Sequence, residues 1–243
     1  MQEVRTETYE NVAHIYEHLM RYVKYDKWAE YIHSLSKDYT TSKSRILELA
    51  CGNGNLSAYL KKYYSNIVIS DKSLTMLYEN DNSSLRKVCC DMLSLSFKTK
   101  FDLIFSTFDS INYLKTQKAL LTLFNEINNI LDAEGIFTFD VSLERNSKKH
   151  IEIPVRRGTY EGIKYVQRTE YNTKNRIHKN IFRMRLKDGK IYKEVHEQKI
   201  YPFETYFKLL EKSKMRVVEC YDAFTFKNAN SNVERVQFLV RKY

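Results

Sequence analysis

The sequence contains few of the residues that interrupt or cross-link a fold. Its 243 residues include two prolines, six glycines and four cysteines, and no low-complexity run or internal repeat. We therefore expect a continuously folded chain. The cysteines, which show no C-x-x-C spacing, are Cys51, Cys89, Cys90 and Cys220. This spacing does not favour chelation or a disulfide framework, and it predicts free thiols in a reducing cytoplasm.

Long apolar stretches are missing as well. No run of about 18 apolar residues occurs, so the sequence predicts no transmembrane helix. The first twenty residues, MQEVRTETYENVAHIYEHLM, lack the apolar centre of a secretion signal. We expect a cytoplasmic protein that does not enter a membrane.

No metal-binding pattern is visible among the six histidines. His14 and His18 have i, i+4 spacing, but no third ligand follows nearby. We expect this pair to lie on one face of an amphipathic helix, and we expect no metal site.

Positive charge is concentrated in the C-terminal part. Residues 1–140 contain 16 Lys and Arg against 18 Asp and Glu, whereas residues 141–243 contain 24 against 12. The C-terminal part therefore carries a net charge of +12, more than the +10 of the whole chain. This excess either attracts an anionic substrate or nucleic acid, or forms a solvated surface that protects exposed strands from aggregation.

Hydrophobic periodicity predicts the main elements. Between about residues 8 and 35, apolar residues recur at helical spacing and indicate one or two amphipathic helices. Short apolar strands then alternate with helical segments. Strands are expected at 45–50, 66–70, 85–90, 101–106 and 135–141, with helices at 56–64, 74–79 and 117–131. This alternation is typical of an α/β fold with a doubly wound, mostly parallel sheet.

The pattern changes beyond Arg157. Three strands at 160–171, 176–186 and 191–201, separated by turn signals, predict an antiparallel β insert. A helix at 203–211 and strands at 215–221 and 235–241 then complete a seven-stranded main sheet. We expect an N-terminal helical lid at 1–40, a core at 41–150 and 202–243, and the insert at 151–201 on the substrate side.

A glycine-rich turn follows the first strand of the core. Gly52 and Gly54 let backbone N–H groups approach a ligand at the positive end of a helix dipole. Asp71 ends the second strand, where a carboxylate can accept both hydroxyls of a ribose, and Asp91 ends the third. The carboxyl ends of parallel strands share one crevice, so these residues predict a groove of nucleoside size.

A nicotinamide dinucleotide is the alternative occupant, because dehydrogenases use the same strand and turn geometry. Their fingerprint places a third glycine three residues after the second, and this chain has Ser57 there. No Tyr-x-x-x-Lys pair is placed on a helix after the fourth strand to act as proton donor. Hydride transfer is therefore disfavoured.

Four segments carry a family resemblance: E-L-A-C-G-N-G-N, I-V-I-S-D-K-S-L-T-M-L, C-C-D-M and F-D-L-I-F-S-T-F-D-S-I-N-Y-L. In this order they resemble the motifs of class I S-adenosylmethionine-dependent methyltransferases. The N-terminal pattern of Tyr9, Tyr16, Arg21, Tyr25 and Trp28, with the late β insert, is similar to small-molecule enzymes such as glycine N-methyltransferase and the aminosugar N,N-dimethyltransferases.

The resemblance implies a Rossmann-like methyltransferase fold, S-adenosylmethionine as cofactor and S-adenosylhomocysteine as product. It implies methyl transfer to a nitrogen or oxygen atom of a small molecule, and the positive charge of the C-terminal part favours an anionic or sugar-linked one. The cofactor-binding residues that it implies are Tyr9, Tyr16, Arg21, Glu48, Ala50, Gly52, Gly54, Asp71, Lys72, Asp91, Met92 and Ser106.

Each of these residues has an implied role. The backbone of Ala50, Gly52 and Gly54 would approach the methionine portion, and Glu48 would hold that loop. Asp71 would accept the ribose hydroxyls, and Asp91 and Met92 would frame the adenine. Ser106 would lie beneath the sulfonium, Arg21 would pair with the cofactor carboxylate, and Tyr9 and Tyr16 would cover the cation with their rings.

Three residues are candidates for the acceptor side. Asp109 and Tyr113 follow the fourth strand, and His196 in the third insert strand resembles a histidine of the aminosugar group and is the candidate base. Each also has a plain structural interpretation, as a helix cap, a packed ring and a surface residue. Trp28 is expected to pack in the core.

Two other functions remain open from the sequence. A nucleic-acid methyltransferase would explain the basic C-terminal part, although the Asn/Asp-Pro-Pro-aromatic signature of DNA amino-methylating enzymes is absent. A non-catalytic protein that binds the cofactor would show the same motifs. The chain is expected to be a monomer or a homodimer.

Overall fold

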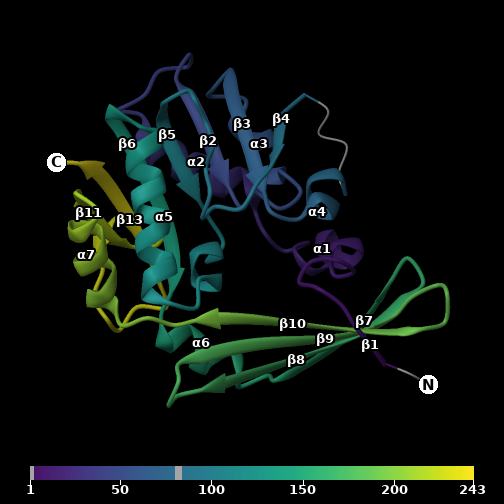
Figure 1. Ribbon diagram of the computed structural model, residues 1–243. Coiled ribbons are helices and arrows are strands. Elements are labelled where there is room, and N and C mark those ends of the chain that lie inside the picture. Colours follow the sequence, from purple (N-terminus) through teal and green to yellow (C-terminus); the bar gives the residue numbers. More distant parts are fainter. Residues whose placement is uncertain (1–2, 80–83) are drawn as a thin grey trace.

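The computed structural model describes residues 3–79 and 84–243, which form two β-sheets and the helices around them (Figure 1). The larger sheet has the strand order β12-β11-β13-β6-β5-β2-β3-β4, and the smaller has the order β1-β10-β9-β8-β7. The predicted α/β class with a doubly wound, mostly parallel main sheet is confirmed.

Five strands of the main sheet are parallel: β2 (Arg45–Leu49), β3 (Asn66–Asp71), β4 (Arg86–Cys89), β5 (Phe101–Ser106) and β6 (Leu131–Ser142). The sheet continues through β13 (Arg235–Lys242), β11 (Met215–Asp222) and β12 (Lys227–Asn228). β13 runs antiparallel to both β6 and β11. The two-residue strand β12 was not predicted, and it gives the sheet an eighth strand.

The parallel strands are apolar because helices cover both faces of the sheet. In β2, Ile46 packs with α2 (Tyr25–Ser36) and α3 (Asn55–Leu60). Its neighbour Leu47 points the other way, toward α5 (Gln117–Ile130) and α7 (Phe203–Lys212). Successive strand residues alternate between faces, so consecutive apolar residues fill two separate cores.

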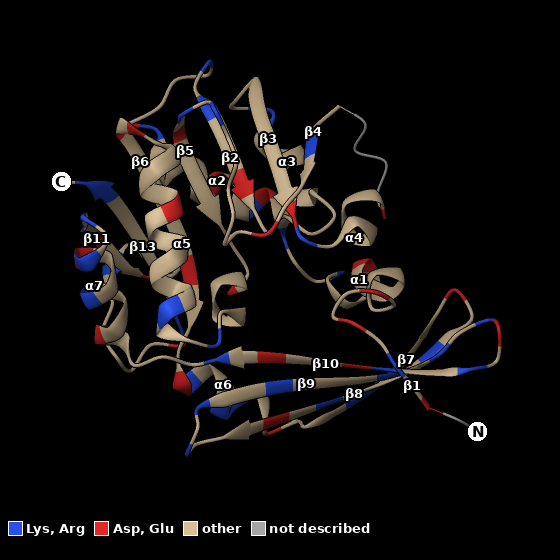
Figure 2. Ribbon diagram, viewed as in Figure 1, with Lys and Arg blue, Asp and Glu red and all other residues tan. Residues whose placement is uncertain are grey.

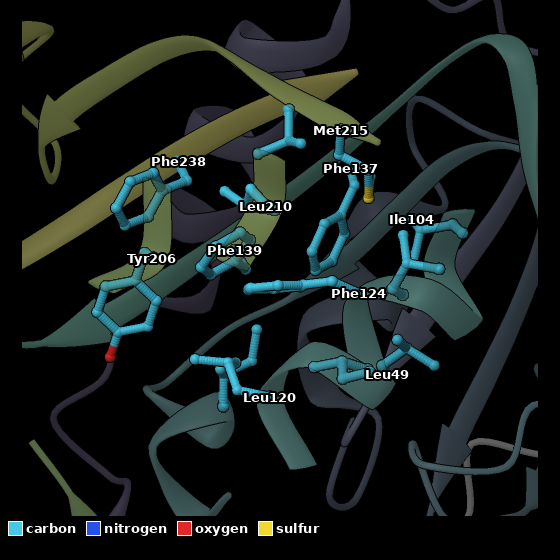
Figure 3. Packing of buried hydrophobic residues seen from close by; sticks show 14 of the residues in the cluster. Leu49, Ile104, Leu120, Phe124, Phe137, Phe139, Tyr206, Leu210, Met215 and Phe238 are labelled. Carbon is cyan, nitrogen blue, oxygen red and sulfur yellow. The ribbon is translucent and has the colours of Figure 1, made fainter. Parts of the chain in front are cut away.

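Aromatic rings fill the core between the sheet and α5 (Figure 3). Phe139 of β6 stacks between Phe137 and Phe238, with ring centroids 4.9 Å from each. Phe139 and Phe238 are direct cross-strand partners in the β6–β13 pair. Full burial of one such side chain stabilises the fold by about 1.5–3 kcal/mol, and these rings fasten the last strand to the parallel sheet.

The second sheet contains β1 (Glu3–Arg5), β7 (Val155–Tyr160), β8 (Ile163–Asn172), β9 (Ile177–Arg185) and β10 (Ile191–Lys199). β8, β9 and β10 match the three predicted insert strands, but β7 and β1 were not predicted. Glu161 and Gly162 both have positive φ and close a tight β7–β8 hairpin. Because the sequence of β7 is mostly polar, no hydrophobic pattern predicts this strand.

The N-terminal segment forms two helices, α1 (Ala13–Leu19) and α2, in agreement with the predicted helical spacing. Val12 and Ile15 pack with Phe182 and Met184 of β9, so α1 lies against the second sheet (Figure 1). The remaining helices are α4 (Leu74–Tyr78), η1 (Ser110–Tyr113) and α6 (Glu144–His150). None of the helices in the described ranges is long and apolar enough to span a membrane.

Charge separates the two sheets. In Figure 2 the strands of the main sheet are largely uncharged, whereas β8, β9 and β10 of the second sheet carry many Lys, Arg and Glu residues. The basic excess of the C-terminal part thus lies mainly on the second sheet and on the outer surface of the last elements. Solvent exposure of one sheet face accounts for the alternation of polar and apolar residues there.

Candidate active site

The loop after β2 depends on left-handed backbone conformations. Ala50, Gly52 and Gly54 have φ angles of 53°, 58° and 77°. A Cβ atom added at Gly52 would lie 3.1 Å from the Met76 methyl carbon, which is tighter than ordinary contact. Glycine at this position therefore allows the left-handed backbone conformation, and without a Cβ atom it lets a ligand approach the backbone.

Asp71, the last residue of β3, holds this loop. Its Oδ2 accepts a hydrogen bond from Gly52 N at 2.8 Å, and its Oδ1 accepts one from Ser73 N at 2.8 Å. Burial raises the pKa of Asp71. Each carboxylate oxygen has a further lone pair, so the group can accept two more donors from a ligand.

Glu48 lies beneath the loop and is 1% exposed. Its Oε2 accepts a hydrogen bond from Ser57 Oγ at 2.5 Å, and burial raises the pKa of Glu48 to about 8. Ser57 is the position where the dinucleotide fingerprint requires glycine, and glycine could not donate this hydrogen bond. Serine at position 57, where the fingerprint has glycine, therefore helps to hold Glu48 beneath the loop.

A cavity of about 1440 Å³ lies between the carboxyl ends of the parallel strands and the second sheet. The predicted site residues that line it are Tyr9, Tyr16, Ala50, Gly52, Asp71, Lys72, Asp91, Met92, Asp109 and Tyr113. Polar residues of the second sheet, among them His178, Asn180 and Gln198, line the same cavity. The structure thus brings the glycine-rich loop and the candidate acceptor residues to one space.

Asp109 follows β5 in a strained backbone conformation. Phe108 and Asp109 have φ angles of 58° and 51°, which are unfavourable for residues other than glycine. The Asp109 carboxylate accepts hydrogen bonds from Arg235 Nη2 at 2.9 Å, Gln198 Nε2 at 3.0 Å and Ser142 Oγ at 3.0 Å. These contacts use most of its accepting capacity and tie β5, β6, β10 and β13 together at the crevice.

Tyr113 and His196 belong to one chain of hydrogen-bonded side chains. Tyr9 Oη lies 2.9 Å from Tyr113 Oη, Tyr113 Oη lies 3.1 Å from His196 Nδ1, and His196 Nε2 lies 3.1 Å from Glu194 Oε2. His196 is 3% exposed, so it is a buried residue and not a surface residue of the sheet.

Glu194 was missed by the sequence analysis. It is fully buried, and its carboxylate also accepts hydrogen bonds from Tyr9 N at 2.9 Å, Asn11 N at 2.5 Å and Val12 N at 3.0 Å. A signal was present, because residues two apart on a strand share a face. A glutamate two residues before the candidate base could therefore have been recognised as its partner.

Comparison with known proteins agrees with this geometry. Residues 46–135 match the protein family described as "Methyltransferase domain". YqeM of Bacillus subtilis (strain 168), a protein with a methyltransferase name, is 26% identical, and the match covers 96% of this chain and 97% of YqeM. A solved S-adenosylmethionine-dependent methyltransferase from Clostridium acetobutylicum ATCC 824 is 27% identical with a TM-score of 0.79, covering 96% of this chain and 98% of the other.

The protein is a methyltransferase that uses S-adenosylmethionine as its cofactor. The methyltransferase shares its fold with the sugar N-methyltransferase KedS8 from Streptoalloteichus sp. ATCC 53650. That structure has a TM-score of 0.75 at 15% identity, and the match covers 93% of this chain and 91% of KedS8. The nicotinamide alternative is set aside by these matches.

The residues of the methyltransferase fit a nucleoside cofactor. The Gly52 backbone on the cavity wall and the spare lone pairs of Asp71 are what a ribose at a strand end requires. In the parts of the chain that the structure describes, no group of three His, Cys, Asp or Glu side chains is arranged to hold a metal ion.

Several predicted cofactor residues of the methyltransferase lie outside the cavity wall. Gly54 is the N-cap of α3. Ser106 is 1% exposed, and its Oγ has no hydrogen-bond partner. Arg21 donates to the carbonyl oxygen of His18 and lies 4.4 Å from the Tyr22 ring, so its guanidinium is turned along its own segment. Arg21 and His196 both line a smaller neighbouring cavity.

Lys72 and Asp91 form a salt bridge at the rim of the groove, with Nζ and Oδ2 2.9 Å apart. The two side chains are 77% and 36% exposed, so the pair contributes at most about 1 kcal/mol to stability. Trp28, in contrast, is buried in the core beside α3, as the sequence predicted.

Proposed function

We propose that the protein methylates a nitrogen or oxygen atom of a small molecule. The observation that carries this proposal is the single continuous cavity that joins the Gly52 loop to the polar face of the second sheet. Its volume of about 1440 Å³ exceeds the roughly 300–1,000 Å³ of a usual small-molecule site. It is therefore large enough for the cofactor and a second small molecule together.

The cofactor-binding roles follow from where the residues lie. Ala50 and Gly52 present backbone to the methionine portion, and Asp71 accepts the ribose hydroxyls. The rim residues Asp91 and Met92 lie farther along the groove and frame the adenine. Bound here, the cofactor supplies an electrophilic methyl group on a sulfonium, and the enclosing residues have to align the acceptor and exclude water.

Tyr9 and Tyr16 cover the cofactor in this arrangement. Their rings are edge-on to each other with centroids 6.0 Å apart, and both side chains line the cavity. Aromatic faces attract a sulfonium by about 0.5–2 kcal/mol. Arg21 would have to turn away from His18 to reach the cofactor carboxylate, and we propose that it does so on binding.

An anionic or sugar-linked acceptor suits the far wall of the cavity. Arg156 lines this wall and makes none of the salt bridges found among the described residues. His178 is buried, its Nδ1 has no partner, and burial lowers its pKa to about 4, so the neutral ring can donate and accept hydrogen bonds. Hydroxyl groups need such partners, and the fold is shared with an enzyme named as a sugar N-methyltransferase.

Calorimetry tests the cofactor half of the proposal. Asp71→Ala removes the ribose acceptor, and we expect S-adenosylmethionine to bind more weakly by about 1.5–3 kcal/mol, or roughly 10- to 100-fold. Asp102→Ala is the matched control, because Asp102 pairs with Arg45 at the opposite end of the sheet and should leave affinity unchanged. Equal affinity of Asp71→Ala and wild type would refute the groove assignment.

Transfer of a radiolabelled methyl group tests the acceptor half. The panel contains aminosugars, sugar phosphates, amino acids, simple alcohols and RNA. Incorporation into one of the small molecules supports the proposal. Incorporation into RNA alone would favour a nucleic-acid enzyme, and tight cofactor binding without any incorporation would favour a non-catalytic protein.

A further inference from the structure

Four side chains link a buried carboxylate to the cavity. The order is Glu194, His196, Tyr113 and Tyr9, and the three hydrogen bonds between them are 2.9–3.1 Å long. Tyr9 and Tyr113 line the cavity, while Glu194 is fully buried. The chain therefore runs from the interior to the space where the acceptor is proposed to bind.

The hydrogen bonds of Glu194 indicate which nitrogen of His196 carries a proton. Its Oε1 faces the N–H groups of Asn11 and Val12, and its Oε2 faces the N–H of Tyr9 and the His196 ring. Backbone N–H groups only donate, so both oxygens of this carboxyl act as acceptors. In the arrangement we argue for, the His196 ring also donates to this carboxyl, from a proton on Nε2.

The donors and acceptors of the other two hydrogen bonds then follow. With its proton on Nε2, neutral His196 accepts at Nδ1, so the donor there is the Tyr113 hydroxyl. The Tyr113 oxygen in turn accepts from the Tyr9 hydroxyl. Tyr9 Oη has spent its own proton, and the lone pair that remains on it is free to accept a proton from a ligand in the cavity.

We infer that Tyr9, Tyr113 and His196, oriented by Glu194, form a proton path that deprotonates an amine acceptor bound as its ammonium ion. This inference rests on the proposed small-molecule methyl transfer and deepens it. It assigns Tyr9 as the residue that contacts the acceptor, and it assigns Glu194 as a positioning residue.

The proton transfer balances within this chain. An N–H bond of the ammonium breaks and its electron pair stays on nitrogen, while the proton passes to Tyr9 Oη. The Tyr9 proton passes to Tyr113 Oη, and the Tyr113 proton passes to His196 Nδ1. The result is a neutral amine ready for methylation, two neutral tyrosines, and an imidazolium beside the Glu194 carboxylate.

Two features favour an amine over a hydroxyl acceptor. The Glu194 carboxylate lies 3.1 Å from His196 Nε2 and stabilises the imidazolium that forms when the path accepts a proton. An ammonium ion gives up its proton to imidazole far more readily than an alcohol does. The faces of Tyr9 and Tyr16 add attraction for the cation.

The surroundings of the path keep its two tyrosines neutral. Burial raises the pKa of both Tyr9 and Tyr113, so neither becomes a phenolate and both only pass protons on. The titratable groups in contact with His196 are Glu194 on its own strand, Tyr113 on η1 and Tyr9 on the N-terminal segment. On β9, the apolar ring of Phe182 packs against the imidazole at 5.1 Å.

Glu194 has a second effect on the path. Tyr9 has a φ of 64°, an unfavourable left-handed conformation, and its N–H donates to Glu194. The same carboxylate thus orients the histidine at one end of the path and holds the backbone of the tyrosine at the other.

Nitrogen NMR of histidine-labelled protein tests the direction of the path without any acceptor. We expect His196 at neutral pH to carry its proton on Nε2. In Glu194→Gln, the amide oxygen stays with Asn11 and Val12, and its NH2 group faces His196, so the proton should move to Nδ1. A wild-type ring protonated on Nδ1, or no tautomer change in Glu194→Gln, would overturn the inference.

Kinetics with the amines that the panel identifies test the function of the path. Tyr9→Phe and Tyr113→Phe should each lower kcat at least tenfold, with unchanged affinity for S-adenosylmethionine. His196→Gln, which cannot take up the proton at the end of the path, should lower kcat to a similar extent. Tyr192→Phe is the control, because Tyr192 lies on the same strand as His196 but its hydroxyl donates to Asp188 and lines neither cavity, and its kcat should equal that of wild type.

The outcomes separate the two proposals. Full activity of Tyr9→Phe on an amine, or wild-type activity on hydroxyl acceptors alone, overturns the proton path and leaves small-molecule methylation intact. A wild-type enzyme that methylates no small molecule overturns the proposed function, and the inference fails with it.

Discussion

The two sheets of this protein reach stability in different ways. In β2 of the main sheet, the residues from Ile46 to Leu49 are all buried, because helices cover both faces. In β10 of the second sheet, the buried residues Glu194, His196 and Gln198 alternate with half-exposed ones. Strand β2 thus buries mainly apolar side chains, whereas β10 buries polar side chains that form hydrogen bonds.

This difference separates the two halves of the site. The proposed cofactor groove uses residues close to the ends of neighbouring strands, such as Gly52 and Asp71. The acceptor side joins distant segments: Tyr9 and Glu194 are 185 residues apart, and Asp109 and Arg235 are 126 apart. One half is a local feature of a sheet edge, and the other exists only after the whole chain has folded.

Loss of a core ring should show the difference in packing most strongly. Phe139→Ala empties the centre of the main core, and we expect a loss of about 3–5 kcal/mol in the free energy of unfolding. Phe182→Ala, in the smaller cluster of the second sheet, should cost at least about 1 kcal/mol less, because α1 can settle onto the gap. Urea unfolding measures both, and equal losses would break the comparison.

The buried carboxylate of the main sheet gives a pH-dependent effect. Burial raises the pKa of Glu48 to about 8, so the folded state binds a proton that the unfolded state releases near pH 4.5. The stability that this proton contributes is present below about pH 4.5 and is lost as the pH rises through 8. Glu48→Gln should therefore gain stability relative to wild type over that range, by a few kcal/mol at most.

Thermal unfolding at pH 6 and pH 9 checks this expectation, with the difference between variant and wild type as the measured quantity. The advantage of Glu48→Gln should be larger at pH 9. An advantage that does not change with pH would mean that Glu48 stays ionised in the folded protein.

Substitution of two glycines with similar backbone angles distinguishes the effect of backbone strain from an effect on the cofactor groove. Gly52 has a φ of 58° with Met76 close by, whereas Gly189, in the β9–β10 turn, has a φ of 79° with no atom within 4 Å. Each change to alanine should cost about 1–2 kcal/mol of stability from backbone strain.

Only Gly52→Ala should also weaken S-adenosylmethionine binding, because its methyl group displaces Met76 and narrows the groove. Calorimetry on both variants checks this expectation. Weaker binding in Gly189→Ala would show that the second sheet controls the cofactor groove, contrary to the division drawn above.

The smallest change in stability is expected when an exposed charge of the second sheet is removed. Arg183 pairs with Glu3 at 2.7 Å, and the two side chains are 51% and 37% exposed. Arg183→Ala should change stability by less than about 1 kcal/mol, and the change should shrink further in high salt. A loss comparable to that of Phe139→Ala in chemical denaturation would show that this sheet depends on its ion pairs.

The fold could be predicted to a large extent because the main sheet leaves clear patterns. The five parallel strands and the helices α3, α4 and α5 appear as apolar runs and helical periods in the sequence. β1, β7, β12 and α6 do not, since they are short or polar and are held by neighbours that are remote in sequence. The glycine-rich turn could also be predicted, because its local backbone angles favour glycine.

The acceptor side could be predicted only in part. Tyr9, Tyr113 and His196 were singled out separately, but nothing in their spacing shows that they share one hydrogen-bonded chain. Glu194 was overlooked because a lone glutamate in a strand rich in charges does not stand out. Asp109 was considered as a partner for an amine, whereas three donors from other strands already use its carboxylate.

By itself, the sequence determined the main sheet and the strand-end residues of the proposed cofactor groove. Apolar periodicity, glycine positions and strand-end carboxylates act over a few residues, so they are visible without coordinates. Only the tertiary structure decided which tyrosines, histidine and glutamate meet across the cavity. The direction of a hydrogen bond and the ionisation of a buried carboxylate depend on all the donors around them, and folding brings those donors from opposite ends of the chain.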